Sequence, residues 1–387
     1  MKIGIITHYH KSKNYGGNLQ AYALCRLLTK NGYEAEQICY EMIMPSVKKK
    51  SIGKRIKRVL TCKNSLFFVK IFDRITAKVK KHAISCEKQK RDAAFLHFNR
   101  KLIPHTEKDY TEENIRDCVD LFDTFITGSD QVWNPLYYSS PFFLNFVPSE
   151  KRKLAYAASI GCESLTDAQK AIFQNSLTDY KAISVREGDA VALLREFTPL
   201  PIQVALDPTL VLEREDWDAV ASERLIEGDY LFCYFLGYNR KERKLAKKYA
   251  KKNGLKIVSI PMILYGYSVI DWNFGDVKLN YASPQDFISL IKYAKCVFTD
   301  SFHAVVFSNI YQKQYFVFNR SKQGEMSTRI VDITALFGQE ERFCRDKTRE
   351  KLAYITALSD IDYKKENEAF ENAKRESIEF LKKNLEG

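Results

Sequence analysis

A histidine stands where a strand gives way to a helix in the stretch VFTDSFHAVVFSNI, residues 297–310. Val297 and Phe298 belong to a short apolar strand that ends in Thr299-Asp300-Ser301, and open α/β sheets bind ligands at such carboxyl strand ends. Histidine is the side chain that titrates closest to physiological pH, so His303 could act as a general acid. The alternative is a half-buried histidine that caps its own helix.

The first strand-to-helix junction, THYHKSKNYGGNLQ, is polar and carries two adjacent glycines before a helix. Backbone N–H groups at such a turn can bind an anion or sugar hydroxyls. The spacing is not G-x-G-x-x-G, so a dinucleotide site is not indicated, and a plain tight turn is the alternative. The candidate acceptor-binding residues of this junction are Asn14, Tyr15, Gly16, Gly17, Asn18 and Gln20.

A second polar loop, ITGSDQVWNP at residues 126–135, follows another predicted strand. Polar side chains that flank a tryptophan suit a carbohydrate, because the ring can stack on the sugar face while its neighbours bind hydroxyls. A buried, capped tryptophan is the alternative. The candidate acceptor-binding residues of this loop are Ser129, Asp130, Gln131 and Trp133.

Arg186 ends a third predicted strand in the segment SVRE. Its guanidinium could hold a carboxylate or phosphate through two parallel hydrogen bonds, or it could form a surface pair with Glu187. The sequence has no P-loop and no assignable Ser/His/Asp order. His8 and His10 are too few for a metal site on their own, so no metal is predicted.

The composition predicts a two-domain protein of the reducing cytosol. The chain has 387 residues, which is long for one domain. Its nine cysteines are scattered without a C-x-x-C pair, which argues against both a zinc site and a disulfide framework. The apolar run before His8 is too short for a signal peptide, and no window approaches the ~18 apolar residues of a membrane span. We therefore expect a soluble cytoplasmic protein.

The excess positive charge of +13 lies in one segment. Residues 46–91 contain 16 Lys/Arg and two acidic residues, whereas the rest has 45 basic and 46 acidic residues. Interleaved apolar residues predict basic amphipathic helices, inserted into the first domain at about residues 46–92. Such helices can contact an anionic membrane, or can simply be a solvated excursion. No nucleic-acid-binding motif accompanies the charge, so nucleic acid is not the expected partner.

Elsewhere, apolar strands alternate with amphipathic helices, which predicts an α/β fold with parallel sheets. The first set of strands begins with KIGIITHY, and a second set begins near Tyr230 with YLFCYFLG. We expect two Rossmann-like domains that face a cleft. The first would span 1–180 on the acceptor side and the second 181–360 on the donor side, followed by a C-terminal helix at 361–387.

Six motifs give the chain a family resemblance. NYGGNLQAYAL, ITGSDQVWN, FFLNFVP followed by KLAYAASIG, ISVRE, DPTLVL and TDSFHA occur in the order found in polysaccharide pyruvyl transferases. The resemblance runs from Lys2 to about Gly338, apart from the basic insertion. It implies a two-domain architecture similar to the GT-B glycosyltransferases. It also implies transfer of the enolpyruvyl unit of phosphoenolpyruvate onto two sugar hydroxyls, which gives a pyruvate ketal.

The resemblance implies roles for particular residues. His303 matches the family's catalytic histidine and Arg186 its donor-binding arginine. Ser301 and Phe302 occupy the donor-binding positions where better-known members have Arg-Leu, so one cation is missing there. Arg329, in STRIVDI, or Lys322 could replace it.

Two other functions stay open at this point. The chain could be a GT-B-type glycosyltransferase that uses a nucleotide sugar, or a non-catalytic glycan-binding relative. Pyruvyl transfer needs no cofactor or metal, since phosphoenolpyruvate is a co-substrate. The expected partners are phosphoenolpyruvate and a sugar acceptor, which could be lipid-linked at the inner face of the membrane.

Overall fold

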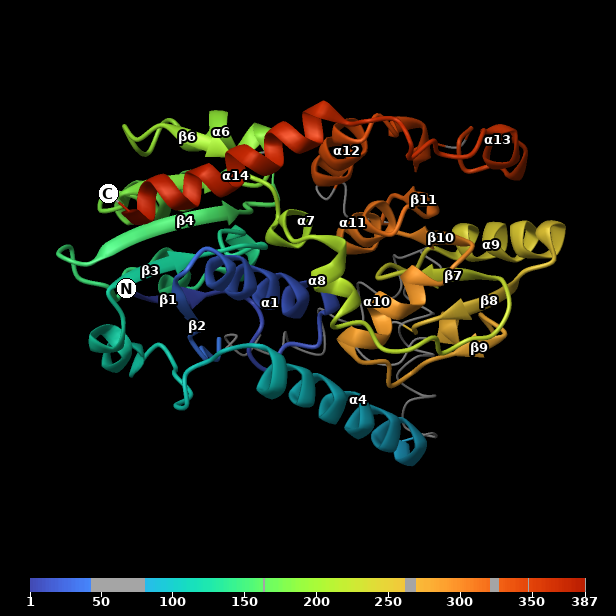
Figure 1. Ribbon diagram of the computed structural model, residues 1–387, viewed down its shortest axis with the longest axis horizontal. Coiled ribbons are helices and arrows are strands. Elements are labelled where there is room, and N and C mark those ends of the chain that lie inside the picture. The colour runs from blue at the N-terminus through green and yellow to red at the C-terminus, as the bar shows by residue number, and fades with distance from the viewer. Residues whose placement is uncertain (43–80, 163, 262–268, 321–326, 347, 387) are drawn as a thin grey trace, which may run out of the picture.

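The chain builds two parallel sheets, as the alternating pattern predicts. The computed structural model describes residues 1–42, 81–162, 164–261, 269–320, 327–346 and 348–386. Within them, each sheet has six strands, and every strand pairs in parallel with its neighbours. Helices connect successive strands and cover the sheets (Figure 1). The two α/β sheets expected from the sequence are therefore confirmed.

The first sheet has the order β2-β1-β3-β4-β5-β6. Its four inner strands are mostly buried on both faces, as parallel strands between helical layers must be, whereas the edge strands β2 and β6 are partly exposed. They are β1 (Lys2–Ile6), β2 (Glu34–Gln37), β3 (Thr124–Thr127), β4 (Arg152–Ala158), β5 (Ala182–Val185) and β6 (Ile202–Val204).

The second sheet has the order β12-β11-β10-β7-β8-β9. Its central strands β7 and β10 are fully buried, and β10 ends immediately before the segment that carries His303. The strands are β7 (Tyr230–Tyr234), β8 (Lys256–Ser259), β9 (Val277–Lys278), β10 (Cys296–Thr299), β11 (Gln314–Phe318) and β12 (Phe343–Cys344).

Local capping fixes where several helices begin. Asn14 caps the first helix by accepting a hydrogen bond from the Gly16 N–H. Ser283 and Asp286 form the reciprocal capping box that the sequence predicts for α10. The helices are α1 (Tyr15–Lys30), α4 (Lys81–Leu102), α5 (Asp167–Ser176), α6 (Gly188–Leu194), α7 (Pro208–Val211), α8 (Arg214–Asp218), α9 (Arg240–Asn253), α10 (Pro284–Lys292), α11 (Phe302–Ile310), α12 (Ser327–Leu336), α13 (Leu352–Ala357) and α14 (Glu368–Glu386).

The division between the domains differs from the predicted one. The boundary expected at residue 180 falls inside the first sheet, because β5 and β6 still pair with β4. Helix α14 returns from the second half and packs along the first sheet (Figure 1), where Arg152 donates hydrogen bonds to the carbonyls of Asn384 and Leu385. The first domain therefore extends past β6 and includes α14.

The C-terminal helix also begins later than predicted. It was expected from residue 361, but residues 361–367 are not helical. The Asn367 side chain accepts a hydrogen bond from the Phe370 N–H and donates one to the Leu336 carbonyl. Asn367 thus acts as the cap that starts α14.

An apolar core joins the two halves through α1 and α10. The Tyr15 ring stacks on Phe287 with centroids 4.9 Å apart, and it meets Tyr234 edge-on at 5.7 Å. Its hydroxyl donates a 2.7 Å hydrogen bond to the Ala282 carbonyl. All of these residues are buried, so the first turn of α1 is fixed against the second half.

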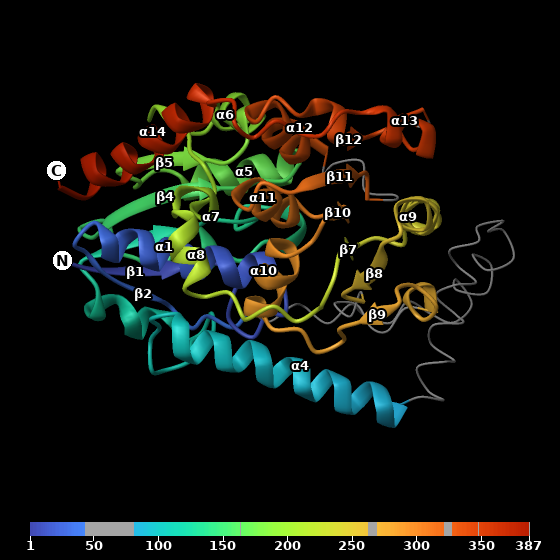
Figure 2. The same cartoon turned by 45° about the vertical axis from the view of Figure 1, so that its right-hand side comes forward.

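Only part of the basic insertion lies within the described structure. The predicted amphipathic helices between residues 46 and 80 fall outside the described residues. Helix α4 runs along one side of the molecule beneath α1 and α10 (Figures 1 and 2), and it buries Arg91 over the Tyr15 ring. Among the described helices, none combines the length and the apolar character that crossing a bilayer requires.

The hydrogen bond of the Tyr15 hydroxyl can be used to test the packing between the two domains. Tyr15→Phe keeps the ring but leaves the buried Ala282 carbonyl without its hydrogen bond, which costs about 1–3 kcal/mol. We expect that loss in the free energy of unfolding by urea. Tyr281→Phe is the matched control, because Tyr281 is half exposed and its change should stay within about 0.5 kcal/mol. If both substitutions lowered the free energy of unfolding equally, the role given to the Tyr15 hydrogen bond would be contradicted.

Candidate active site

The carboxyl ends of the first sheet bring three separated segments together. Ser129 and Asp130 follow β3, Arg186 follows β5, and Asp207 follows β6. Because these strands are parallel members of one sheet, with only β4 between β3 and β5, the residues after them meet at one edge. Gly128, with φ of +114°, lets the β3 loop turn closely over β4, since a Cβ there would lie 2.1 Å from the Tyr156 carbonyl oxygen.

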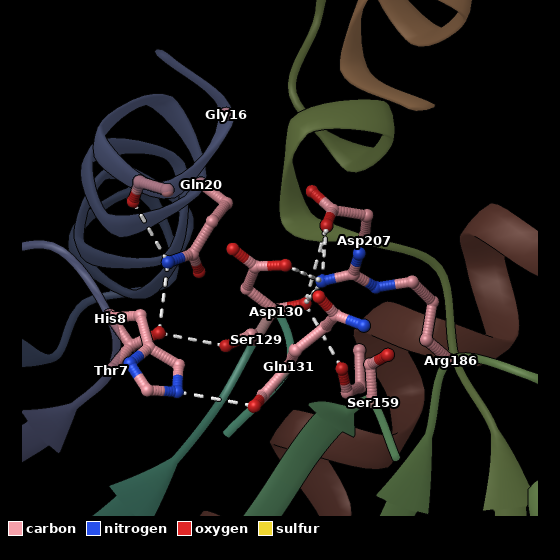
Figure 3. A network of polar contacts seen from close by, with 12 residues as sticks. Thr7, His8, Gly16, Gln20, Ser129, Asp130, Gln131, Ser159, Arg186 and Asp207 are labelled. Atoms are coloured by element: carbon pink, nitrogen blue, oxygen red, sulfur yellow. Dashed lines mark hydrogen bonds and ion pairs between the residues drawn. The ribbon is translucent and has the colours of Figure 1, made fainter. Parts of the chain in front are cut away.

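Asp207 is the centre of this cluster. Its Oδ2 lies 2.9 Å from Arg186 Nη2, and the same Nη2 donates a 2.8 Å hydrogen bond to Ser129 Oγ (Figure 3). Its Oδ1 accepts hydrogen bonds from the Thr209 N–H and hydroxyl. The Asp207 side chain is completely buried, so these neighbours replace water around the carboxylate.

His303 reaches the same carboxylate from the second half of the molecule. It lies in the first turn of α11, and its Nε2 is 3.5 Å from Asp207 Oδ2. His303 is buried, and Ser301, not His303, is the residue before the helix. The alternative that His303 only caps its own helix is therefore wrong.

The start of α1 closes the other side of the imidazole. A Cβ placed on Gly16 would lie 2.0 Å from His303 Nδ1, so only glycine fits at this position. A Cβ on Gly17 would meet the His8 carbonyl oxygen at 2.6 Å. The paired glycines thus let the first helix approach the histidine and the Asp130 loop.

Hydrogen bonds fix these loops relative to one another. Gln20 donates to Thr7 Oγ1, and Thr7 in turn donates to the Ser129 carbonyl (Figure 3). His8 Nε2 lies 3.1 Å from the Gln131 carbonyl. The end of β1, the first turns of α1 and the β3 loop therefore form one rigid unit.

Arg186 retains hydrogen-bonding capacity. Its Nε and Nη1 are buried and have no hydrogen-bond partner among the described residues. The guanidinium lies over the Phe302 ring, 5.0 Å from its centroid. Two unused N–H groups beside His303 are suited to an anionic ligand.

A second arginine approaches from α12. Arg329 is buried, and its Nε lies 3.7 Å from Glu187 Oε1. Ser159 donates a hydrogen bond to the same Glu187 oxygen, while Oε2 has no partner among the described residues. The surface pair between Arg186 and Glu187 considered from the sequence is therefore wrong: each of these neighbours pairs elsewhere, and both are buried.

The charges of the cluster depend on one another. Burial alone would raise the pKa of Asp207 and of Asp130, but nearby Arg186 and His303 hold both carboxyl groups below their ordinary pKa range. Burial raises the pKa of Glu187, and Arg329 offsets only part of that increase. Burial also lowers the pKa of Arg329, which Glu187 partly opposes.

Two predicted acceptor-binding residues are structural instead. Trp133 is completely buried, stacks on Phe143 at 5.8 Å and donates its indole N–H to the Phe142 carbonyl. Tyr15 lies in the core that joins the two halves. Neither ring can stack on a sugar from these positions, because protein side chains already cover them.

The remaining predicted residues either brace the first strand-to-helix junction or lie at or beside the Asp207 cluster. Asn14, Asn18 and Gln20 brace the first junction, where Asn18 donates to the carbonyls of Ser12 and Asn14. The side chain of Gln131 is partly exposed beside the cluster. The residues that the structure places at or beside the cluster are His303, Arg186, Arg329, Ser301, Phe302, Gly16, Gly17, Ser129 and Asp130; Lys322 lies outside the described residues.

Sequence reasoning missed Asp207 and Glu187. Asp207 precedes Pro208 and Thr209 and caps α7, with Pro208 at the first helical position. An Asp-Pro pair at a helix start is a common capping signal, which conceals any second role. Its position after a strand of the same sheet was the available clue.

The cluster can bind an anion and move a proton. His303 presents Nε2 to a fixed carboxylate and Nδ1 to the start of α1. Buried Arg186 pairs with the same carboxylate, and buried Arg329 lies near Arg186 and Asp130. A carboxylate next to one ring nitrogen orients the imidazole, which leaves the other nitrogen for a reacting group.

Comparison with known proteins identifies both family and fold. The family model described as polysaccharide pyruvyl transferase matches residues 14–322. A search of curated proteins found no match. Among solved structures, UDP-GlcNAc 2-epimerase from Methanocaldococcus jannaschii has a TM-score of 0.52 at 13% identity and covers 100% of both chains. UDP-N-acetylglucosamine 2-epimerase from Rickettsia bellii has a TM-score of 0.51 at 10% identity, covering 100% of this chain and 96% of its own. These similarities confirm the GT-B-like fold.

Asp207→Asn tests the importance of the central carboxylate for stability. The change keeps the shape but removes the nearer of the two carboxylates beside buried Arg186 and leaves only Asp130, 3.6 Å away, which we expect to cost about 3 kcal/mol of unfolding free energy at pH 7. The pKa of Asp207 is lower in the folded chain than its ordinary value of 3.8. The difference between wild type and variant should therefore be complete above about pH 4 and shrink as the pH falls further.

Urea unfolding of both proteins across that pH range measures the effect. Glu41→Gln is the control, because it removes one partner of an exposed pair with Lys11 and should cost less than about 1 kcal/mol. A difference between wild type and Asp207→Asn that grows with acidification would contradict the assigned charge state.

Proposed function

The chain belongs to the polysaccharide pyruvyl transferase family, and from that premise we propose that it joins the enolpyruvyl unit of phosphoenolpyruvate to two hydroxyls of one sugar. The product is a pyruvate ketal on a polysaccharide or on its lipid-linked precursor. One observation carries the proposal: Arg186 and His303, from opposite halves of the chain, converge on Asp207. These are the residues that the family resemblance assigns to donor binding and to protonation.

The reaction divides into two additions at the same carbon. The first hydroxyl oxygen bonds to C2 of phosphoenolpyruvate while a proton is delivered to C3, so that the C2–C3 double bond becomes a single bond and C3 becomes the methyl group. The first hydroxyl gives up its own proton in this step, which replaces the proton delivered to C3. The second hydroxyl oxygen then bonds to C2 as the bond from C2 to the phosphate oxygen breaks. Phosphate leaves with the second hydroxyl proton, so the sequence needs no oxidant, cofactor or metal.

His303 is suited to deliver the proton to C3. Its Nε2 faces Asp207, so Nδ1 is the nitrogen directed at the substrates. The donor would lie beside this nitrogen, so we propose that His303 is the general acid of the reaction. A positioned general acid contributes about 10²–10⁴ in rate.

Arg186 and Arg329 are suited to bind the donor. Arg186 has two unused N–H groups next to His303, and Arg329 approaches the same cluster from α12. Ser301 carries no charge, so the cation missing from that position has to come from elsewhere. Arg329 is the buried arginine of the second half that lies next to Glu187 and is close enough to Arg186 for each charge to affect the other.

The acceptor would bind between the start of α1 and His303. Gly16 and Gly17 offer backbone there, and Ser129 and Asp130 lie at the same edge. In the structure Gly16 touches His303, so the acceptor can enter only when the start of α1 separates from the start of α11. A flat sugar ring inserted there would place two hydroxyls beside Nδ1.

The basic segment suggests where the acceptor is presented. Residues 46–91 carry all of the excess positive charge, and a lipid-linked precursor lies at an anionic membrane surface. We propose that this segment holds the cytoplasmic enzyme peripherally at the inner face of the membrane.

Donor binding and proton transfer can be separated by two variants. His303→Gln should keep the thermal shift caused by phosphoenolpyruvate but lower phosphate release with a suitable acceptor by about 10²–10⁴. Arg329→Gln should lose most of the shift, which for wild type corresponds to about 2.7 kcal/mol at 100 times the dissociation constant. Differential scanning fluorimetry and a phosphate-release assay measure the two effects.

Arg342→Gln is the control for loss of a buried arginine. Arg342 contacts the Phe316 ring and the Ser359 carbonyl, away from His303, so its variant should retain the shift. If wild type shifts with UDP-sugars and not with phosphoenolpyruvate, the chain is a glycosyltransferase. If it shifts with neither and binds oligosaccharide alone, it is a glycan-binding relative.

Membrane contact is tested by neutralising charge in matched places. At about 1 kcal/mol for each basic residue near an anionic surface, replacing a cluster by Gln should weaken binding to phosphatidylserine-containing vesicles roughly 100-fold or more. The test cluster is Lys48, Lys49, Lys50, Lys54, Arg55, Lys57 and Arg58; the control cluster, exposed on α9, is Arg240, Lys241, Lys244, Lys247, Lys248, Lys251 and Lys252. Vesicle sedimentation measures binding, and equal losses in both variants would show non-specific attraction only.

A further inference from the structure

Three metal-ligating side chains converge away from His303. His10 follows β1, Cys39 follows β2, and Asp109 lies between α4 and β3. Their ligand atoms all lie within 4.8 Å of one another, and His10 Nε2 is 3.3 Å from Asp109 Oδ1. Across the described part of the chain, no other set of three His, Cys, Asp or Glu side chains gathers this closely.

The imidazole of His10 is in a state suited to bind a cation. Its Nε2 is buried and makes no hydrogen bond to the described residues, although Asp109 lies nearby. An unused, buried nitrogen of this kind is costly unless something occupies it.

The thiol and the carboxylate are held in place by neighbours. Cys39 Sγ lies 3.3 Å from the Tyr9 hydroxyl, and the Cys39 N–H donates a 3.0 Å hydrogen bond to Thr106 Oγ1. Lys11 Nζ lies 3.0 Å from Asp109 Oδ2, which leaves Oδ1 directed at His10. Such surrounding contacts orient metal ligands in known sites.

A cavity of about 320 Å³ adjoins the three side chains and includes them in its wall. Two more buried oxygens of lining residues, Asp92 Oδ1 and Asn99 Oδ1, have no partner within the described chain. The cavity therefore has room for water next to the cluster, together with polar groups that could hold it.

We propose that His10 Nε2, Cys39 Sγ and the Asp109 carboxylate bind one divalent transition-metal cation of the zinc class, with water from the cavity as the fourth ligand. Imidazole, thiolate and carboxylate in tetrahedral arrangement suit Zn²⁺, whereas Mg²⁺ and Ca²⁺ prefer oxygen ligands alone. The thiol proton is released when the cation binds. The inference is independent of the proposed pyruvyl transfer.

This site was excluded by spacing when only the sequence was considered. The absence of C-x-x-C and the isolation of the two early histidines argued against zinc, but that argument applies only to ligands close together in sequence. Here, β1, β2 and the segment before β3 bring the ligands together in space. The bound cation would fix the segment between β1 and α1, which ends at Asn14, two residues before Gly16.

Cobalt titration of the metal-free full chain tests the proposal. One equivalent of Co²⁺ should produce a thiolate-to-cobalt charge-transfer band together with the visible bands of tetrahedral cobalt, and Zn²⁺ should remove both. Cys39→Ser should abolish the charge-transfer band. His10→Gln and Asp109→Asn should weaken Co²⁺ binding by at least about 10-fold.

Matched controls come from exposed residues of α4. Cys86→Ser and His97→Gln should bind Co²⁺ like wild type. Asp109 is half exposed, so its variant remains informative if a change at buried Cys39 prevents folding. The proposal is overturned if wild type shows no charge-transfer band, if that band survives in folded Cys39→Ser, or if Asp109→Asn binds as tightly as wild type.

Discussion

One buried carboxylate organises the candidate active site. Asp207 lies in the first domain, yet it meets Arg186 from the same domain and His303 from the second. A lone carboxylate without water would be very unfavourable, so its position requires both partners to stay close. The geometry of the imidazole is therefore tied to the sheet edge that carries Arg186. Any motion between the halves has to stretch or break this contact.

The two domains contact each other beside His303, where the proposed reaction would take place. Packing of Tyr15 against Phe287 fixes the first turn of α1, and Gly16 in that turn touches His303. Glycine is required because any side chain would occupy the space of the imidazole. The same close approach keeps water out of the cluster and strengthens its electrostatic interactions. Under the proposed function, the start of α1 would have to move away from α11 for a substrate to reach the imidazole.

The sequence was sufficient for the architecture but only partly for the site. Strand and helix periodicity predicted both sheets, because buried parallel strands and amphipathic helices leave strong patterns. Trp133 was misassigned because a polar loop around an aromatic residue looks the same whether the ring faces a ligand or the core. Asp207 was missed because its capping role already explained it. The sequence shows which residues follow the end of each strand. It does not show the order of the strands in the sheet, which determines which of these residues lie next to one another.

The ion pairs of Arg186 and Glu187 affect which ligands the candidate site can bind. Arg186 and Glu187 are adjacent, yet they pair with Asp207 and Arg329, so both arginine charges are already balanced by carboxylates. An anionic donor that had to displace Asp207 would expose a buried charge, which is costly. The unused Nε and Nη1 of Arg186 remove that requirement, since a phosphate or carboxylate can bind them while Nη2 keeps its contact with Asp207. Donor binding and the orientation of His303 are thus compatible on one guanidinium, a combination that a lysine with its single ammonium group could not provide.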